Sequence, residues 1–461
     1  MTNSRSLCLP KPAPVPIPGG LVGQLALRPW LDAVILRAIV SGYLPLSRGW
    51  AAAREAAGSA DAFRELAPYH HRVSARLARA LGAIERRDRD YRQALAAWDD
   101  AFFGDSEVSD ADLVAHEGAR RHAAHRLMAA RGLLVPWIRR FPPVRWRIAD
   151  RATVAERHGS RLNGSATAFP QPPATPVEES RKVPSTLGRE YWLRFRAPSP
   201  RLDEDVLAHV FEPDVPADPP TLIALHGIAL EPEMMKQINE PDFELVRRGF
   251  RVIRTCAPGH ARRAPAGCYG GEVVMAGGPL GFIELFEAWV GEVAVLIGWA
   301  RQSSTAPVAV AGLSLGALTT QLLAEAASGW PEHLRPDAVC LTATSGDVVE
   351  TVLRGSVARA LGAEHVLGEH GWSRDDVEPW RPVLEPRGQP AMSPDRVVMV
   401  LGAADTLTPY SGGAALANAW QVPPENLFVR PRGHFTVGLN AYNDPTPLLR
   451  LAEIVAQPTH R

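Results

Sequence analysis

Residues 312–316 read Gly-Leu-Ser-Leu-Gly, a G-x-S-x-G pattern that is the strongest chemical signal in the sequence. The apolar run 308–311 precedes it and the helix-like stretch 317–327 follows it. A strand–turn–helix of this kind holds the serine hydroxyl above a sheet as a nucleophile. The glycines leave room where a Cβ would collide with backbone, and the helix points free N–H groups toward a developing oxyanion. The pattern therefore predicts Ser314 as the nucleophile of an acyl-transfer reaction.

A nucleophilic serine needs a base and an acid, and the order Ser, acid, His along the chain is expected here. Asp405 follows the apolar run 397–401, and His434 follows a second such run and a glycine. His434 would take the Ser314 proton and return it to the leaving group, while Asp405 would hold the imidazole tautomer. Asp347 also follows a strand-like run and is the alternative acid, but Asp405 is favoured.

Two backbone N–H groups are expected to form the oxyanion hole. One belongs to Leu315, the residue after the nucleophile, and the other to Ile228, in the loop after the apolar run 222–225. His226 lies in the same loop, and we expect it to shape that loop by hydrogen bonding rather than to act as the base.

From about Gly188 to its end, the chain resembles the α/β-hydrolase fold superfamily. Within that part, three pieces look like a group of poorly characterised bacterial α/β hydrolases: the stretch 257–272, the elbow 312–316, and the acid turn 402–409 with its later Gly-His pair. The resemblance implies Ser314 as nucleophile, Asp405 as acid and His434 as base. One departure is the alanine that follows the elbow, where many members have glycine.

The chain divides into three zones of different composition. Residues 1–158 are predicted to form a mainly helical N-terminal region, 159–187 a Pro/Ser-rich linker, and 188–461 the catalytic domain. In the last zone, short apolar runs alternate with helix-length segments, which favours an α/β fold with a mostly parallel sheet, helices on both faces and an antiparallel pair at its start. Residues 347–390 form a long connection, predicted as a lid insertion.

Two arginines lie in the loop that follows the apolar run 250–253. Arg262 and Arg263 follow a strand end, where either solvent or a substrate carboxylate would meet them. Solvated arginines in a structural loop are the favoured interpretation.

The composition argues against several classes of partner and cofactor but does not identify a function. The 461 residues carry 50 basic and 50 acidic side chains, so broad electrostatic binding to nucleic acid is not expected. Four cysteines without metal spacing predict buried free thiols, and no nucleotide, flavin or metal signature appears. The best membrane candidate, Trp30–Leu46, is short and carries charges, so we expect an amphipathic helix packed on its own domain and no transmembrane segment.

These observations predict a serine hydrolase of carboxylesterase or lipase type, which cleaves an ester or related acyl bond through an acyl-serine intermediate. An acyltransferase using the same residues, or a catalytically silent hydrolase-fold binding protein, are the alternatives. We expect a small-molecule acyl substrate, no cofactor, no metal, no nucleic-acid partner and a cytoplasmic location. The helical N-terminal region is a candidate surface for forming a homo-oligomer or for binding another partner.

Overall fold

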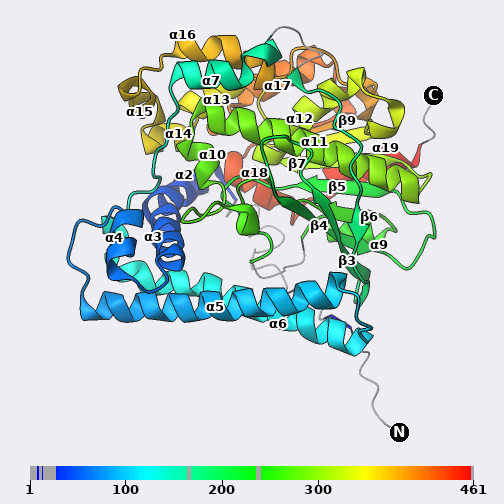
Figure 1. Cartoon of the computed structure of the whole chain (residues 1–461). Helices are drawn as coiled ribbons and strands as arrows, with labels where there is room; N and C mark the ends of the chain where they lie inside the picture. Colours follow the sequence, from blue (N-terminus) through cyan, green and yellow to red (C-terminus); the bar gives the residue numbers. More distant parts are fainter. Residues whose placement is uncertain (1–7, 10–12, 14–26, 163–167, 235–239, 458–461) are drawn as a thin grey trace.

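The computed structural model describes residues 8–9, 13, 27–162, 168–234 and 240–457, and their centre is a ten-stranded sheet (Figure 1). The strands are β1 (Glu178–Glu179), β2 (Val183–Ser185), β3 (Gly188–Arg196), β4 (Asp205–Glu212), β5 (Thr221–Leu225), β6 (Arg251–Arg254), β7 (Val308–Leu313), β8 (Ala338–Thr342), β9 (Val397–Gly402) and β10 (Leu427–Arg430).

The strand order is β1-β3-β4-β6-β5-β7-β8-β9-β10, with β2 paired to β3. Strands β1 to β4 pair antiparallel, β4 also pairs antiparallel with β6, and the pairs from β6 to β10 are parallel. Parallel strands place their carboxyl ends at one edge, where ligands bind in open α/β sheets. The predicted fold class is confirmed: the sheet is mostly parallel and begins with an antiparallel pair.

Helices cover both faces of this sheet, and further helices precede it. Those before the sheet are α2 (Pro29–Ala38), η1 (Ile39–Tyr43), α3 (Leu44–Glu55), α4 (Ala60–Leu66), α5 (Ala75–Phe103), α6 (Asp110–Ala129), η2 (Ala130–Arg140), α7 (Arg151–His158) and η3 (Gly159–Leu162). Those after β5 are α9 (Phe243–Arg247), α10 (Glu272–Ala276), α11 (Pro279–Ser303), α12 (Leu315–Ala326), α13 (Val348–Arg354), α14 (Ser356–Leu361), α15 (Ala363–Glu369), α16 (Arg374–Val377), α17 (Tyr410–Ala419), α18 (His434–Asn440) and α19 (Thr446–Ala456). Short 3-10 turns complete them: η4 (Ala261–Arg263), η5 (Ala327–Gly329), η6 (Glu332–Leu334), η7 (Glu378–Val383), η8 (Pro394–Arg396) and η9 (Pro424–Asn426).

The strand residues alternate between two apolar clusters. In β9, Val397 and Met399 belong to the cluster that includes α11 and α12, whereas Val398 and Val400 belong to the cluster that includes α9 and α19. This alternation is the period of two that an extended strand imposes. Because both sets are buried, the strand reads as a continuous apolar run in the sequence.

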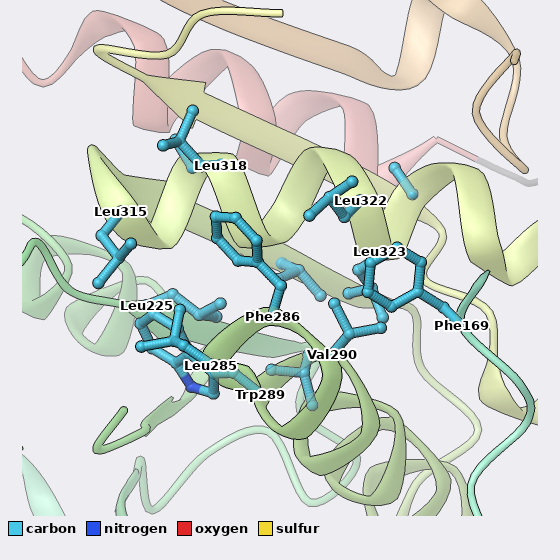
Figure 2. Packing of buried hydrophobic residues seen from close by; sticks show 14 of the residues in the cluster. Phe169, Leu225, Leu285, Phe286, Trp289, Val290, Leu315, Leu318, Leu322 and Leu323 are labelled. Carbon is cyan, nitrogen blue, oxygen red and sulfur yellow. The ribbon is translucent and has the colours of Figure 1, made fainter. Parts of the chain in front are cut away.

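Helices α11 and α12 pack tightly against each other and against the sheet (Figure 2). Phe286 and Trp289 of α11 lie against the Leu315, Leu322 and Leu323 side of α12, and all five side chains are buried. This packing fixes the first turn of α12, which directly follows Ser314.

The helical N-terminal region does not bury its apolar residues alone. Its cluster, which includes Trp50 and Phe63, also contains Tyr269 and Met275 of the segment around α10. Part of the predicted linker pairs with the sheet as β1 and β2. The antiparallel helices α5 and α6 lie side by side along one side of the molecule (Figure 1).

Helices α2, η1 and α3 form one continuous helix, Pro29–Glu55. Within the described residues it is the one helix that is long and apolar enough to cross a membrane by length and composition, with 17% of the tested window buried. All ten residues of α2 are at least partly exposed, whereas nine residues of α3 are buried. The part of this helix that packs on its own protein is therefore α3, whereas α2 and η1 have no buried residue, so the expectation of packing for Trp30–Leu46 is met only at the C-terminal end of that segment.

Candidate active site

Ser314 lies in the sharp turn between β7 and α12, with φ +54° and ψ −115°. Such a backbone is strained for a residue with a Cβ. The Ser314 N–H donates to Thr342 O at 2.9 Å, which ties the turn to the next strand. A Cβ on Gly312 would lie 2.2 Å from Gly316 O, and one on Gly316 would lie 2.4 Å from Leu225 O. Both glycines are therefore required sterically, as predicted.

His434 bridges the serine and the acid. Its Nε2 lies 2.9 Å from Ser314 Oγ, and its Nδ1 lies 2.8 Å from Asp405 Oδ2. The three residues are between 6% and 8% exposed, so the chain of hydrogen bonds is shielded from water but still reachable. The structure thus brings together Ser314, Asp405 and His434, the three residues singled out in the sequence.

Asp405 is held by a dense set of donors. Its Oδ1 accepts from the N–H groups of Leu407 at 2.9 Å and Thr408 at 3.0 Å. The Thr408 hydroxyl lies 2.9 Å from Asp405 Oδ2 and 3.1 Å from His434 Nδ1. These contacts leave Oδ2 as the atom that faces the imidazole. Sequence reasoning missed Thr408, although a threonine shortly after the acid in a tight turn is a signal for such support.

The alternative acid, Asp347, is engaged elsewhere. It caps α13 by accepting from the Glu350 N–H at 3.0 Å, and its Oδ1 lies 3.1 Å from Arg381 Nη1. The geometry therefore favours Asp405 as the partner of His434.

The loop that carries Ile228 is clamped by two histidines, of which His226 is half-buried and His260 is fully buried. His226 Nε2 accepts from the Ala257 N–H at 3.1 Å, and His260 Nε2 accepts from the Ala229 N–H at 3.3 Å. Their Nδ1 atoms face the carbonyls of Gly227 and Pro258, at 2.7 and 3.0 Å. Burial lowers the pKa of His226 to about 4 and, together with the neighbouring His226, lowers that of His260 to about 3. Both rings are neutral clamps at physiological pH.

The clamped loop lies directly against Ser314. A Cβ on Gly227 would lie 3.6 Å from Ser314 Cβ. Ile228 and Leu315, the expected owners of the oxyanion amides, both line the same cavity as Ser314. This proximity is what their predicted role requires, and the role itself stays a prediction.

The two arginines of η4, after β6, contact carboxylates of the protein. Arg262 Nε lies 2.7 Å from Glu233, and Arg263 makes two bonds to Glu292 at 2.6 and 2.8 Å. The Arg263 side chain is 2% exposed, so the interpretation of a solvated arginine is wrong for this residue. A buried charge persists only when it is paired, and Glu292 supplies the partner.

Ser314 opens into an apolar cavity of about 90 Å³. It is lined by Trp146, Ile228, Met275, Gly278, Pro279, Phe282, Ser314, Leu315, Leu318, Thr351, Val352, Leu353, Val357, Ala358, Leu361, Ala363, Leu367, Leu407 and Thr408. Helices α13, α14 and α15, inside the predicted 347–390 insertion, supply a large share of this wall. Trp146 comes from the segment before α7, and sequence reasoning missed it because nothing local distinguishes it from a core tryptophan.

Comparisons with known proteins concern the fold. Neither a protein-family model nor a curated protein matches the chain. Among solved structures, it is similar to acetyl xylan esterase 1 from Thermoanaerobacterium sp. JW/SL YS485, with 18% identity and a TM-score of 0.43 over 62% of this chain and 94% of that one. It is also similar to a cold-adapted esterase from an Arctic intertidal metagenomic library, with 16% identity and a TM-score of 0.37 over 58% of this chain and 95% of that one. A third similar structure is acylaminoacyl peptidase of Pyrococcus horikoshii, with 10% identity and a TM-score of 0.38 over 60% of this chain and 47% of that one.

The strand order and the Ser314 elbow are those of the α/β-hydrolase fold, and that class is assigned from the topology itself. At the identities above, the solved structures add nothing about substrate.

Proposed function

We propose that this protein is a serine hydrolase that cleaves an ester or related acyl bond of a small molecule with an apolar acyl group. The observation that supports it is the hydrogen-bonded chain from Ser314 Oγ through His434 to Asp405, set at an apolar cavity. A protein that had kept the fold only for binding would not need all three groups at hydrogen-bond distance.

In the proposed reaction, Ser314 Oγ attacks the acyl carbon while His434 Nε2 takes the hydroxyl proton. The carbonyl oxygen becomes an oxyanion, which the Leu315 and Ile228 amides would stabilise. The intermediate collapses to acyl-Ser314, and the imidazolium returns its proton to the leaving group. A water, deprotonated by His434, then attacks the acyl-serine and releases the acid with a regenerated hydroxyl.

The cavity sets the expected size of the acyl group. One water-sized group needs roughly 10–15 Å³ of such space, so a cavity of about 90 Å³ takes roughly six to nine heavy atoms. Because almost all lining side chains are apolar, we expect a short to medium alkyl or aryl acyl group to bind better than a charged one.

The test combines labelling with a substrate series. A fluorophosphonate should label the wild type at Ser314 and leave Ser314→Ala unlabelled. With para-nitrophenyl esters from acetyl to decanoyl, kcat/KM should peak between butanoyl and octanoyl. An unlabelled, correctly folded wild type contradicts the proposal. Product analysis with an added alcohol separates hydrolysis from acyl transfer, because a transferase would form the new ester in preference to the free acid.

A further inference from the structure

Helix α18 begins with His434, but its N-terminus lacks a cap of its own. The first amides of a helix have no intrahelical acceptor, and a side chain at the preceding position usually supplies one. That position is Gly433, which has no side chain. The acceptor comes instead from Asp32 of α2.

Asp32 makes three contacts at this helix end. Its Oδ1 accepts from the Phe435 N–H at 2.6 Å and from the Thr436 N–H at 3.3 Å. The Thr436 hydroxyl donates to Asp32 Oδ2 at 2.5 Å and accepts from the Gly433 N–H at 2.9 Å. The backbone on both sides of His434 is therefore tied to one carboxylate.

The glycine before the histidine is part of the same arrangement. A Cβ on Gly433 would lie 2.4 Å from Asp32 Cγ and 2.6 Å from its Oδ1. Any side chain at this position would have to displace the carboxylate. This close approach explains why a glycine precedes His434.

The continuous helix that carries Asp32 contacts two elements of the candidate active site. None of the α2 residues is buried, so α2 contributes little to the apolar core. It contacts α18, and the η1 turn that continues it contacts α14, whose residues line the cavity. The N-terminal segment thus lies against both the base and the wall of the acyl site.

We propose that Asp32 is a positioning residue for the base, which makes the N-terminal helix a working part of the catalytic site. The inference rests on the proposed function, because it assigns to Asp32 an effect on the reaction of Ser314. Without the carboxylate, the first turn of α18 loses the acceptor for two amides and a hydroxyl. The 2.9 Å contact between His434 Nε2 and Ser314 Oγ is then no longer held in place.

The proposal predicts a loss in kcat that is separate from KM. Asp32 does not line the cavity, so its removal should leave substrate binding alone. A displacement of the base by about 1 Å costs on the order of a hundredfold in rate. We expect Asp32→Ala to lower kcat about ten- to hundredfold, with KM within about twofold.

Two variants separate positioning from general stability. Asp32→Asn keeps an oxygen for the two amides and offers its NH₂ group to the Thr436 hydroxyl, so it should retain kcat within about threefold. Asp150→Ala is the matched control, since Asp150 caps α7 with the same kinds of bonds, from the Thr153 N–H at 2.8 Å and hydroxyl at 3.0 Å. It should lower the midpoint of thermal unfolding as Asp32→Ala does and leave kcat unchanged.

The proposal is overturned if Asp32→Ala keeps kcat within twofold of the wild type, or loses no more than Asp150→Ala. Should Asp32→Ala fail to fold, Thr436→Val tests the same bridge from the other side and must lower kcat without raising KM. Hydrogen exchange gives a readout independent of activity: peptides covering 434–440 should exchange faster in Asp32→Ala, and unchanged exchange refutes the role of Asp32. An unlabelled Ser314 in the wild type would instead refute the proposed function.

Discussion

Replacing Asp405 by asparagine tests how the acid controls the base. In the wild type, Oδ1 accepts two backbone N–H groups, from Leu407 and Thr408, and Oδ2 faces His434 Nδ1. An asparagine that keeps its oxygen on the two amides must turn its NH₂ group toward Nδ1. The imidazole then accepts at Nδ1 and carries its proton on Nε2, where it cannot take the proton of Ser314.

The size of the rate loss is set by the free energy needed to rotate the amide of the asparagine into the productive orientation. Turning the amide over restores an oxygen toward His434 but leaves two backbone N–H groups facing an NH₂ group. Each unsatisfied buried donor costs about 1–3 kcal/mol, so together the cost is about 2–6 kcal/mol. At 1.36 kcal/mol for each factor of ten, kcat should fall by roughly 30-fold to 25,000-fold.

The assay compares steady-state hydrolysis of a para-nitrophenyl ester by Asp405→Asn and Asp347→Asn. An asparagine at position 347 keeps the helix cap through its oxygen and loses only the charge pairing with Arg381, so this variant should keep kcat within twofold and lose no more than about 1 kcal/mol of stability. If Asp405→Asn lost less than about tenfold, or if Asp347→Asn lost as much, the tautomer argument would be refuted.

Three other outcomes are expected. Ala358→Phe in α14 fills the cavity and should lower kcat/KM for octanoyl esters at least about tenfold while sparing acetyl esters, whereas Ala360→Phe, on an exposed position of the same helix, should not. The unfolded state binds protons at His226 and His260 below pH 6.5, but the folded state does not until about pH 4 and 3. These two histidines should therefore lower the free energy of unfolding in urea by about 4 kcal/mol between pH 8 and pH 5, and His260→Gln should remove about half of that contribution. Gly316→Ala places a methyl group 2.4 Å from Leu225 O. It should lower the free energy of unfolding by roughly 1–3 kcal/mol and abolish the labelling of Ser314 by a fluorophosphonate.

The sheet and the reacting groups were predictable because their signals are local. A buried strand such as β9 must be apolar on both faces, and the elbow at Ser314 needs glycine on both sides for steric reasons that a short pattern records. Chain order alone left both Asp405 and Asp347 open as the acid, because both lie between Ser314 and His434; it is the contact of Asp405 with His434, and of Asp347 with Arg381, that favours Asp405.

Contacts between distant segments left no such pattern. Thr408 could have been suspected from its turn, but Trp146 and Asp32 belong to the helical N-terminal region, and no spacing connects them to the site. Arg263 shows the same limit, since its burial depends on Glu292, which lies on a different helix. The positions of these residues depend on packing between elements that are distant in the chain, and no local sequence pattern records such packing.

The contact between Asp32 and Phe435 joins residues 403 positions apart in the chain. Closing so long a loop is costly in entropy until the intervening sheet has formed and brought the two segments near each other. We therefore expect folding to be ordered in time, with helices and sheet forming before the base is fixed in its place. A partly folded chain would then have its nucleophile turn already built and still lack a competent base, so hydrolytic activity would be among the last properties that the folding protein acquires.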